Sequence, residues 1–557
     1  MSLDSLLECF KSSLKASAIS VLSCKNNEYK LVKLITTQES LPSYTIFEGK
    51  VDSLTPFYAE GYQMLSQTCG TFLNPISIGR CPDDEPPYCQ NPNPNFKNCY
   101  NYCLFFEDNK WYLLGFTSSN HYIGVFYLYP NGKIKIDMDL ACAKLKVGEL
   151  LEFESFTILE GDSKQELLDK FAALINSHHK PLQFKSNPNG WCSWYYYYEN
   201  ISSKAIKDNL ELLKEHKALE YIQIDDGYQT HMGDWLCFTD KFEGGLKAIV
   251  DDIHKEGKKA ALWVAPFIVS GNSKVFKEHS DFLLKDSFGN LVSSDNLTYG
   301  GWRDTPWYAL DFSNPKVLDY ITKVFHYFSH DLHIKYFKLD ACYWGAIRSY
   351  CYNRNFSCVD NYRKGLEIIL KAVGKDAFIL GCNAPLWPSL GLVHGMRVSD
   401  DIVREHHRIK QIAFEVFNRQ WMNKKLWIND PDCLCLKNLT NQIASTDDYK
   451  VHLATILISD GVLMLGDAIH TLEDTDFEKI NKILEVKAWD KELSYKDDFS
   501  YFKIQNKKTH EVIEVYFNFS DKELALSFAK PCKEFWSGDS IQGKYTISAN
   551  SALCVLD

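Results

Sequence analysis

The spacing of apolar positions changes twice along this chain of 557 residues. From the amino terminus to about residue 185, short alternating runs such as Tyr29–Ile35 and Cys99–Phe106 are separated by turn formers such as Pro130–Gly132. Alternation with a period of two residues and frequent turns is typical of antiparallel strands. The pattern therefore predicts an N-terminal antiparallel β-sandwich domain over residues 1–183.

In the central part of the chain, short apolar runs alternate with helical stretches. The apolar runs are Asn189–Tyr196, Leu219–Asp225, Lys259–Phe267, Ile334–Cys342, Ala377–Cys382, Gly395–Asp401, Leu426–Asp430 and Gly461–Gly466. The helices expected between them include Ser202–Lys214, Leu246–Glu256, Pro315–Phe328 and Asp360–Val373. This alternation reaches the number of strands that a closed barrel of parallel strands requires. The rival fold is a doubly wound open sheet, but no Gly-rich phosphate loop follows any of these runs.

We therefore predict an α/β fold with a catalytic (β/α)8 TIM barrel over residues 184–485. Alternating runs return near the carboxyl end, as in Val512–Phe519 and Leu524–Phe528. They predict a small C-terminal all-β domain over residues 486–557.

Bulk composition narrows the classes of function. Hydrophobic residues make up 45% of the chain and charged residues 24%, which is ordinary for a soluble globular protein. The net charge of −11 argues against binding to nucleic acid or to an anionic membrane. Aromatic residues reach 14%, which suits large cores and also flat surfaces that stack on sugars.

The sequence also bears on location and cofactors. No apolar run approaches the roughly 20 residues of a membrane span, and the N-terminus lacks the basic and apolar regions of a secretory signal. Eighteen cysteines in such a chain indicate reduced thiols, so we expect a cytoplasmic protein. Cys81, Cys89, Cys99 and Cys103 cluster, but only the last pair approaches a zinc-knuckle spacing. We expect no metal and no cofactor, and the sequence leaves open whether the chain forms a homo-oligomer.

Lys338 and Asp340 are the first candidates for chemistry, because they end the apolar run Ile334–Cys342. Positions two apart on a strand point to the same side. A nearby lysine lowers the pKa of a carboxylate, and an ionised carboxylate can attack carbon. A structural ion pair at the end of a strand would explain the two residues equally well.

The ends of the other predicted strands carry further polar and aromatic residues. In a barrel of this type the site lies at the carboxyl ends of the strands. Those ends supply Trp194, Tyr196, Asp225, Asp226, Trp263, Lys338, Asp340, Cys382, Arg397, Ser399, Asp401, Asp430, Asp432 and Asp467. Any one carboxylate here can simply cap the next helix, but that explanation is much harder to apply to all of them together.

Two carboxylates at the ends of different predicted strands, one beside Lys338 and one near Arg397, would supply the pair that glycoside hydrolysis uses. Arg397, Ser399 and Asp401 alternate, so an extended chain would point all three to one side. In that chemistry one carboxylate attacks the anomeric carbon and a second carboxyl protonates the leaving oxygen. We expect burial or neighbouring carboxylates, Asp400 among them, to raise the pKa of the second acid.

Seven sequence motifs together resemble glycoside hydrolase family 36, which contains retaining α-galactosidases and their relatives. They are Gly190–Tyr197, Ile224–Gln229 with Gly233–Trp235, Leu262–Phe267, Lys338–Asp340, Gly381–Cys382, Ala384–Leu386 and Met396–Asp401. They occur in the family's order and cover nearly the whole predicted barrel.

The resemblance implies a role for each matching position. Asp340 would be the nucleophile and Asp401 the general acid and base. Asp225 and Asp226 would hold the outer hydroxyls of galactose. The remaining positions would lie beside the reacting centre or line the sugar pocket: Lys338, Arg397, Trp263, Tyr196, Trp194 and, near the 2-position, Cys382. Tyr62 is the candidate for an aromatic residue from the N-terminal domain that closes the pocket.

The sequence departs from the family pattern at two places. Members usually carry glycine where Asn383 stands, and Gly-Pro where Ser399 and Asp400 stand. Asn383 would narrow the 2-position pocket or offer it a hydrogen bond, and Asp400 adds charge beside the proposed acid. Leu386 is bulky where enzymes for acetamido sugars tend to have a small residue, which favours galactose.

The sequence leaves several classes of function open. The leading hypothesis is a retaining α-galactosidase acting on a small-molecule α-galactoside, with an α-N-acetylgalactosaminidase or a transglycosidase as alternatives on the same scaffold. A metal-dependent barrel hydrolase usually has histidines at strand ends, where only His394 is a candidate. A sugar-binding protein without catalysis is disfavoured because both Asp340 and Asp401 are present.

Overall fold

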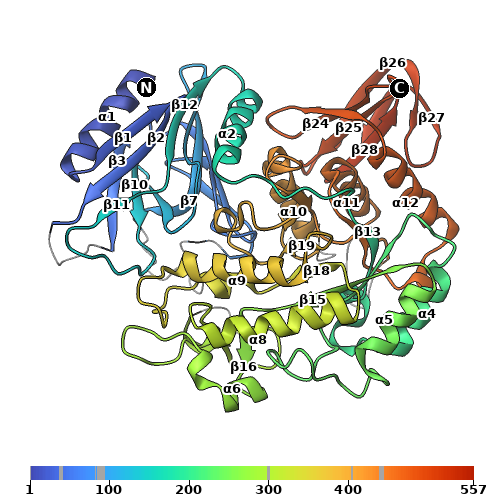
Figure 1. The fold of residues 1–557 in the computed structure, drawn as a ribbon. Helices are drawn as coiled ribbons and strands as arrows, with labels where there is room; N and C mark the ends of the chain where they lie inside the picture. The colour runs from blue at the N-terminus through green and yellow to red at the C-terminus, as the bar shows by residue number, and fades with distance from the viewer. Residues whose placement is uncertain are drawn as a thin grey trace.

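The computed structural model describes residues 2–36, 42–81, 83, 95–297, 301–402, 406–437 and 445–557. It begins with a twelve-stranded antiparallel sheet domain, which lies at the upper left in Figure 1. Its strands are β1 (Ser20–Lys25), β2 (Glu28–Leu34), β3 (Ser43–Lys50), β4 (Pro56–Glu60), β5 (Gln67–Thr71), β6 (Pro75–Ile78), β7 (Lys97–Glu107), β8 (Lys110–Phe116), β9 (Ile123–Leu128), β10 (Lys133–Asp139), β11 (Leu150–Glu152) and β12 (Phe156–Gly161). The runs predicted near residues 29–35 and 99–106 are β2 and β7.

Two helices accompany this sheet, and the sequence pattern did not predict the first. Helix α1 (Leu3–Ala16) buries Leu6, Phe10 and Leu14, which recur every four residues on one face. Ser2 caps its amino end by accepting a hydrogen bond from the Ser5 N–H at 3.3 Å. Helix α2 (Lys164–His178) follows the sheet and leads the chain to the barrel (Figure 1).

The central domain is the predicted parallel barrel. Its strands are β13 (Asn189–Cys192), β14 (Tyr221–Ile224), β15 (Lys259–Val264), β18 (Tyr336–Leu339), β19 (Phe378–Gly381), β20 (Gly395–Arg397), β21 (Ile428–Asp430) and β22 (Leu463–Leu465). Each pairs in parallel with its neighbour, and β13 also pairs with β22. Between β21 and β22, the Val462 N–H donates to the Asn429 carbonyl oxygen at 2.9 Å. The ring of strands is thus nearly closed.

Helices lie along the chain between and after these strands. They are α3 (Trp194–Tyr197), α4 (Ser203–Leu213), α5 (Gly245–Lys255), α6 (Lys274–Glu278), α7 (Ser294–Leu297), α8 (Pro315–His326), α9 (Cys358–Val373), α10 (His406–Asn418), α11 (Thr446–Ser459) and α12 (Asp474–Lys487). The four helices predicted from the sequence are α4, α5, α8 and α9. Between β15 and β18 the chain makes a long excursion. It contains α6, α7 and the antiparallel strand pair β16 (Ile268–Ser270) and β17 (Trp307–Ala309).

The C-terminal segment forms a six-stranded antiparallel sheet. Its strands are β23 (Lys491–Tyr495), β24 (Tyr501–Asn506), β25 (Val512–Asn518), β26 (Leu524–Glu534), β27 (Ser540–Ile547) and β28 (Ser551–Leu556). The sheet lies near α10, α11 and α12 at the upper right of Figure 1. The rings of Phe499, Phe502 and Phe517 lie within 5.7 Å of the Phe417 ring at the end of α10. The boundary proposed at residue 485 falls inside α12, so this helix is better kept with the barrel.

Candidate functional site

Asp340 lies at the carboxyl end of β18. Its carboxylate accepts hydrogen bonds from the Trp263 Nε1–H at 3.0 Å and from the Ala341 N–H at 2.6 Å. Its own N–H donates to the Val264 carbonyl at 2.9 Å, which fixes it to strand β15. The indole thus holds one carboxylate oxygen and the backbone holds the other. The Asp340 side chain is half-buried. This arrangement sets the carboxylate in one orientation at the barrel mouth.

Lys338 makes its ion pair with Asp225. The Lys338 Nζ lies 3.1 Å from Asp225 Oδ2, and both side chains are buried. Burial works to lower the pKa of Lys338, but Asp225 and neighbouring thiols raise it well above its usual range. Burial raises the pKa of Asp340, and the Asp401 charge adds to this, against Lys338 and Trp263. The expectation that Lys338 would lower the pKa of Asp340 is therefore wrong as a net result, because burial outweighs it.

Asp225 and Asp226 follow β14 and are held differently. Asp225 also accepts a hydrogen bond from the Gln223 Nε2–H at 2.7 Å, and Ser193 Oγ receives its backbone N–H at 3.0 Å. Asp226 is bound by the Trp302 Nε1–H and the Arg303 Nε–H, both at 2.8 Å. The Asp226 carboxylate is therefore held by two residues of the long segment between β15 and β18.

Arg397, the last residue of β20, contacts three polar groups. Its Nη2 lies 2.8 Å from Asp401 Oδ1, 2.6 Å from Asp432 Oδ2 and 3.4 Å from the Tyr195 hydroxyl. Arg397 is fully buried, whereas the Asp401 side chain is 44% exposed. Asp401 is thus the member of this group that a ligand in the barrel mouth can reach.

The pKa values of these carboxylates differ from the sequence-based expectation. Burial works to raise the pKa of Asp401, but Arg397, Lys338 and Arg80 lower it below its ordinary value. Burial raises the pKa of Asp432 to about 6, although Arg397 opposes this. The expected raised pKa of Asp401 is therefore wrong, because Arg397 lies directly against its carboxylate.

The aromatic residues after β13 lie differently from the prediction. The predicted strand Asn189–Tyr196 ends at Cys192, and Trp194–Tyr197 form a helical turn. Tyr195 therefore points inward, where its hydroxyl donates to Asp432. Tyr196 instead contacts His470, with ring centroids 5.6 Å apart, and Trp194 contacts Tyr198. Among the described contacts, none joins Tyr196 or Trp194 to the carboxylates, so their places in the sugar pocket stay predictions.

Cys382 and Asn383 follow β19 beside this group. Arg397 Nη1 lies 3.8 Å from the buried Cys382 Sγ, and the Asp340 charge adds to burial in raising the pKa of this thiol well above its usual range. Asn383 adopts φ +45°, in the left-handed region where glycine is favoured. Among the described residues, its Oδ1 is buried and has no hydrogen-bond partner.

The N-terminal domain reaches this strand through Met64. The Asn383 N–H points at the Met64 sulfur at 3.4 Å. Tyr62 is buried two residues earlier and packs on Tyr100 and Tyr343, with ring centroids 5.1 and 6.0 Å away. The structure therefore places Tyr62 in the junction between the domains, and Met64 is the residue of this segment that lies beside Asn383.

Three residues that contact the site escaped the sequence analysis. The predicted strand continued through residue 196, and in such a strand Trp194 and Tyr196, but not Tyr195, would point into the site. Trp302 and Arg303 come from the excursion between β15 and β18 and are separated from Asp226 by more than 70 residues of sequence. No periodic signal marks them, although Trp302 stands out as an aromatic residue beside a cation.

The remaining predictions concern metals, histidines and membranes. Cys89 lies outside the described residues, and within them no group of three or more His, Cys, Asp or Glu side chains is arranged to hold a metal ion. His394 precedes β20, and its Nδ1 accepts the Ile379 N–H at 3.1 Å, so it lies away from the mouth. Every cysteine in the described ranges is a free thiol. None of the described helices combines the length and apolar character needed to cross a membrane.

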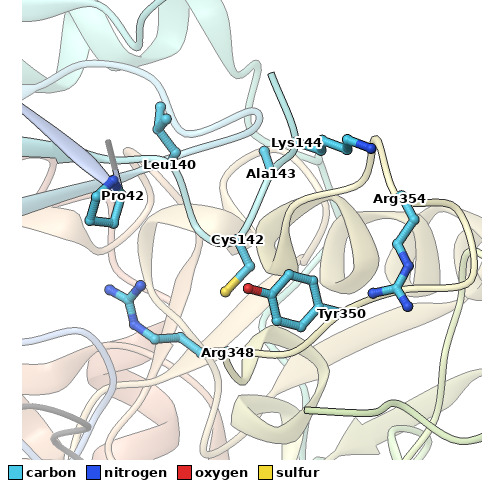
Figure 2. Close-up of a pocket in the computed structure, with 8 residues that line it drawn as sticks. All are labelled: Pro42, Leu140, Cys142, Ala143, Lys144, Arg348, Tyr350 and Arg354. Atoms are coloured by element: carbon cyan, nitrogen blue, oxygen red, sulfur yellow. The ribbon is translucent and has the colours of Figure 1, made fainter. Parts of the chain in front are cut away.

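A separate cleft of about 480 Å³ lies at the junction of the N-terminal domain and the barrel (Figure 2). It is lined by Pro42, Leu140, Cys142, Ala143, Lys144, Arg348, Tyr350 and Arg354. The Arg348 guanidinium is already paired with Asp139, at 3.0 Å for one hydrogen bond. None of the residues predicted for the catalytic site lines this cleft.

Known proteins resemble the chain in sequence and in fold. Residues 160–354 match the Melibiase family model. The α-galactosidase Mel36A of Lactobacillus acidophilus is 30% identical over 156 residues, which cover 25% of this chain and 21% of that protein. The alignment thus spans about a fifth of this curated relative.

Solved structures cover much more of the chain. TtGalA, an α-galactosidase from Thermus thermophilus in complex with p-nitrophenyl α-D-galactopyranoside, superposes with a TM-score of 0.65 at 20% identity, covering 87% of this chain and 97% of that chain. The α-galactosidase from Lactobacillus brevis gives a TM-score of 0.66 at 11% identity, covering 95% of this chain and 77% of that chain. Residues 160–354 thus match the melibiase family, the chain shares the fold of these solved α-galactosidases, and the resemblance read from its motifs is confirmed.

Proposed function

We propose that the protein is a retaining α-galactosidase that releases terminal α-linked galactose from small saccharides. The observation that carries this proposal is the pair of carboxylates at the barrel mouth, Asp340 on the Trp263 indole and Asp401 on the Arg397 guanidinium. The two carboxylates are close enough to interact, since the Asp401 charge raises the pKa of Asp340. The melibiase match and the family motifs support the choice of substrate class.

In the first step, a carboxylate oxygen of Asp340 forms a bond to the anomeric carbon as the bond to the leaving oxygen breaks. Asp401 gives its proton to that oxygen, and the products are a glycosyl-aspartate and the free alcohol. In the second step Asp401 takes a proton from water, whose oxygen bonds to the anomeric carbon. The ester bond to Asp340 breaks, and both carboxyl groups return to their starting states.

Arg397 and Asp432 allow Asp401 to carry the proton. Arg397 lowers the pKa of Asp401 when it lies against that carboxylate. The same guanidinium nitrogen lies 2.6 Å from Asp432, so Asp432 remains as its partner when Asp401 is neutral. Ionisation of Asp432 thus offsets the loss of the Asp401 charge beside the buried arginine.

The remaining residues of the mouth would bind the sugar. Asp225 and Asp226 would hold the outer hydroxyls of galactose, and Trp263 would form part of the wall. In this structure the Asp226 carboxylate is oriented by Trp302 and Arg303. A carboxylate whose oxygens are already directed by fixed donors can accept hydroxyl hydrogen bonds with little further ordering.

The proposal is tested by measuring hydrolysis of a panel of aryl α-glycosides and the stereochemistry of the first-formed sugar. We expect p-nitrophenyl α-D-galactopyranoside to be the best substrate and α-galactose to be released first. Asp340→Asn should abolish turnover while the circular dichroism spectrum and melting temperature stay close to those of the wild type. Hydrolysis by Asp340→Asn near the wild-type rate, or first release of β-galactose, would contradict the proposal.

An α-N-acetylgalactosaminidase or a transglycosidase remains as the second candidate. The observation that favours keeping it is Asn383, whose buried Oδ1 has no partner among the described residues and lies beside Cys382, near the proposed 2-position. Such an amide could bind the acetamido group of N-acetylgalactosamine. Rates for matched galactose and N-acetylgalactosamine substrates, with analysis of transfer products, separate these activities.

A further inference from the structure

Asp400 directly precedes the proposed acid Asp401 in the sequence, at a position where the family pattern has proline. Its side chain is fully buried, and its carboxylate pairs with Arg408 of α10 and, at 3.1 Å, with Arg80. It accepts the Asp401 N–H at 2.7 Å, and its own N–H donates to Glu415 at 2.7 Å. Asp400 thus touches the backbone of the acid and two cations from different parts of the fold.

Arg80 comes from the N-terminal domain, two residues after β6. Gly79 has φ +107°, and a Cβ atom there would lie 2.1 Å from the Leu65 carbonyl oxygen. The same carbonyl accepts the Cys81 N–H at 3.2 Å. The backbone on both sides of Arg80 is therefore fixed, although its side chain is 56% exposed. This turn directs a cation from one domain to the acid of another.

We propose that Arg80 and Asp400 form a pair of opposite charges that governs the protonation of Asp401, so that the N-terminal domain sets the pH range of the barrel's general acid. The inference rests on the proposed function, in which Asp401 is that acid. Both residues would act through Asp401 and are therefore positioning residues, not catalytic ones. The usual Gly-Pro of the family has no charge at these positions, so the device would belong to this chain.

The charges around the two aspartates predict the direction in which each substitution should shift the pKa of Asp401. Among the described residues, Asp401 faces the cations Arg397, Lys338 and Arg80 and the carboxylates Asp340, Asp430 and Asp432. The Tyr195 hydroxyl and the Cys382 thiol also face it. Arg80 is one of the groups that lower the pKa of Asp401. Removing Arg80 should therefore raise the pKa of Asp401.

Asp400 has its own set of charged neighbours. Among the described residues they are Arg80 from the N-terminal domain, Arg408 and Glu415 from α10, and Asp401 itself, and the Cys81 thiol also faces Asp400. The Asp401 charge makes Asp400 harder to ionise. Because repulsion between two like charges is mutual, an ionised Asp400 should also make Asp401 harder to ionise. Removing the Asp400 charge should therefore lower the pKa of Asp401, which is the opposite of the effect expected from removing Arg80.

The test is the pH dependence of kcat/KM for p-nitrophenyl α-D-galactopyranoside. The alkaline limb of this profile reports loss of the proton from the general acid of the free enzyme. Arg80→Gln should move that limb to higher pH and Asp400→Asn to lower pH, each by on the order of one pH unit. Arg80→Lys keeps the charge and should restore the wild-type profile. Arg354→Gln, in the separate cleft of Figure 2, removes the same charge elsewhere and should leave the profile unchanged.

Outcomes that contradict the inference are distinct from failure of the proposed function. A limb that moves the same way in both variants, or moves in neither, overturns the inference in an enzyme that remains active. Arg80→Gln alone decides the sign if Asp400→Asn does not fold, because Arg80 is largely exposed. If the wild type hydrolyses no α-glycoside, the proposed function fails. NMR titration of 13C-labelled aspartate, with Asp401 assigned by Asp401→Asn, then tests the same two shifts without turnover.

Discussion

The guanidinium of Arg419 lies 2.6 Å from the carboxylate of Glu60, and both side chains are fully buried where the barrel meets the N-terminal domain. Arg419 also donates to the carbonyl oxygens of Met64 and Val398, both at 2.7 Å. Val398 directly follows β20, three residues before Asp401. One buried cation thus joins the segment that carries Met64 to the strand end that carries the proposed acid.

This pair predicts a large loss of stability when only its cation is removed. Arg419→Met leaves the Glu60 carboxylate buried without its counter-charge, which should cost about 3–5 kcal/mol of unfolding free energy. Glu60→Leu combined with Arg419→Met removes both charges and should recover part of that loss. Urea denaturation of the two variants and the wild type measures the difference. Equal losses in the single and double variants would mean that the backbone hydrogen bonds of Arg419, and not its charge, are what matter.

Glu415 predicts a pH dependence of stability. Burial and the Asp400 charge raise its pKa from 4.5 to about 7. A folded-state pKa above the unfolded value means that stability is fully present below about pH 4.5 and is lost as the pH rises through about 7. Glu415→Gln stays neutral, so relative to this variant the wild type should lose roughly 3 kcal/mol between pH 4.5 and 8.

Melting temperatures of wild type and Glu415→Gln across this range provide the measurement. Gln411 donates to Glu415 at 2.7 Å, and the side-chain carbonyl oxygen of the new glutamine can accept this same hydrogen bond. Parallel curves for the two proteins from pH 4.5 to 8 would show that Glu415 ionises as freely as in the unfolded chain.

The proposed roles of the two catalytic carboxylates predict different dependence on the leaving group. Asp401→Asn removes the proton donor, which should lower kcat by about 10²–10⁴ for an alkyl galactoside. The loss should be much smaller for p-nitrophenyl α-D-galactopyranoside, because nitrophenolate leaves without a proton. Steady-state rates for both substrates give the comparison. The same loss on both substrates would contradict the role of Asp401 as the acid.

Asn383 predicts a change in substrate preference. Its φ of +45° suits glycine, so Asn383→Gly should alter the unfolding free energy by no more than about 1 kcal/mol. Removing the side chain opens the space beside Cys382. If Asn383 narrows the 2-position, kcat/KM for the N-acetylgalactosaminide should rise relative to the galactoside. A fall in this ratio would indicate that the Asn383 amide binds the acetamido group.

The order of elements could be predicted from the sequence because each strand and helix leaves a local period. The runs ending near Asp225, Asp340 and Arg397 are strands of the barrel, and their carboxyl ends meet at one mouth whatever the side chains between them. Helix α1 was not predicted, although its apolar residues recur every four positions. It lies in a part of the chain where alternating runs favour strands.

Contacts within the site were decided by the tertiary structure. Tyr195, and not Tyr196, reaches Arg397 because the strand turns into a helix after Cys192, and a change of period by a few residues reverses which side chain points inward. Arg303 reaches Asp226 from a distant excursion that has no periodic pattern.

By itself, the sequence determined the barrel, its flanking β domains and the positions of Asp340 and Asp401, since these follow from local periods and short motifs. The protonation of those carboxylates was decided only in three dimensions. The pKa of Asp340 is raised by burial despite Lys338, and that of Asp401 is lowered by Arg397 although partial desolvation opposes this. The reason is that a pKa sums the desolvation and charge of every neighbouring group, and most of those neighbours are distant in the chain.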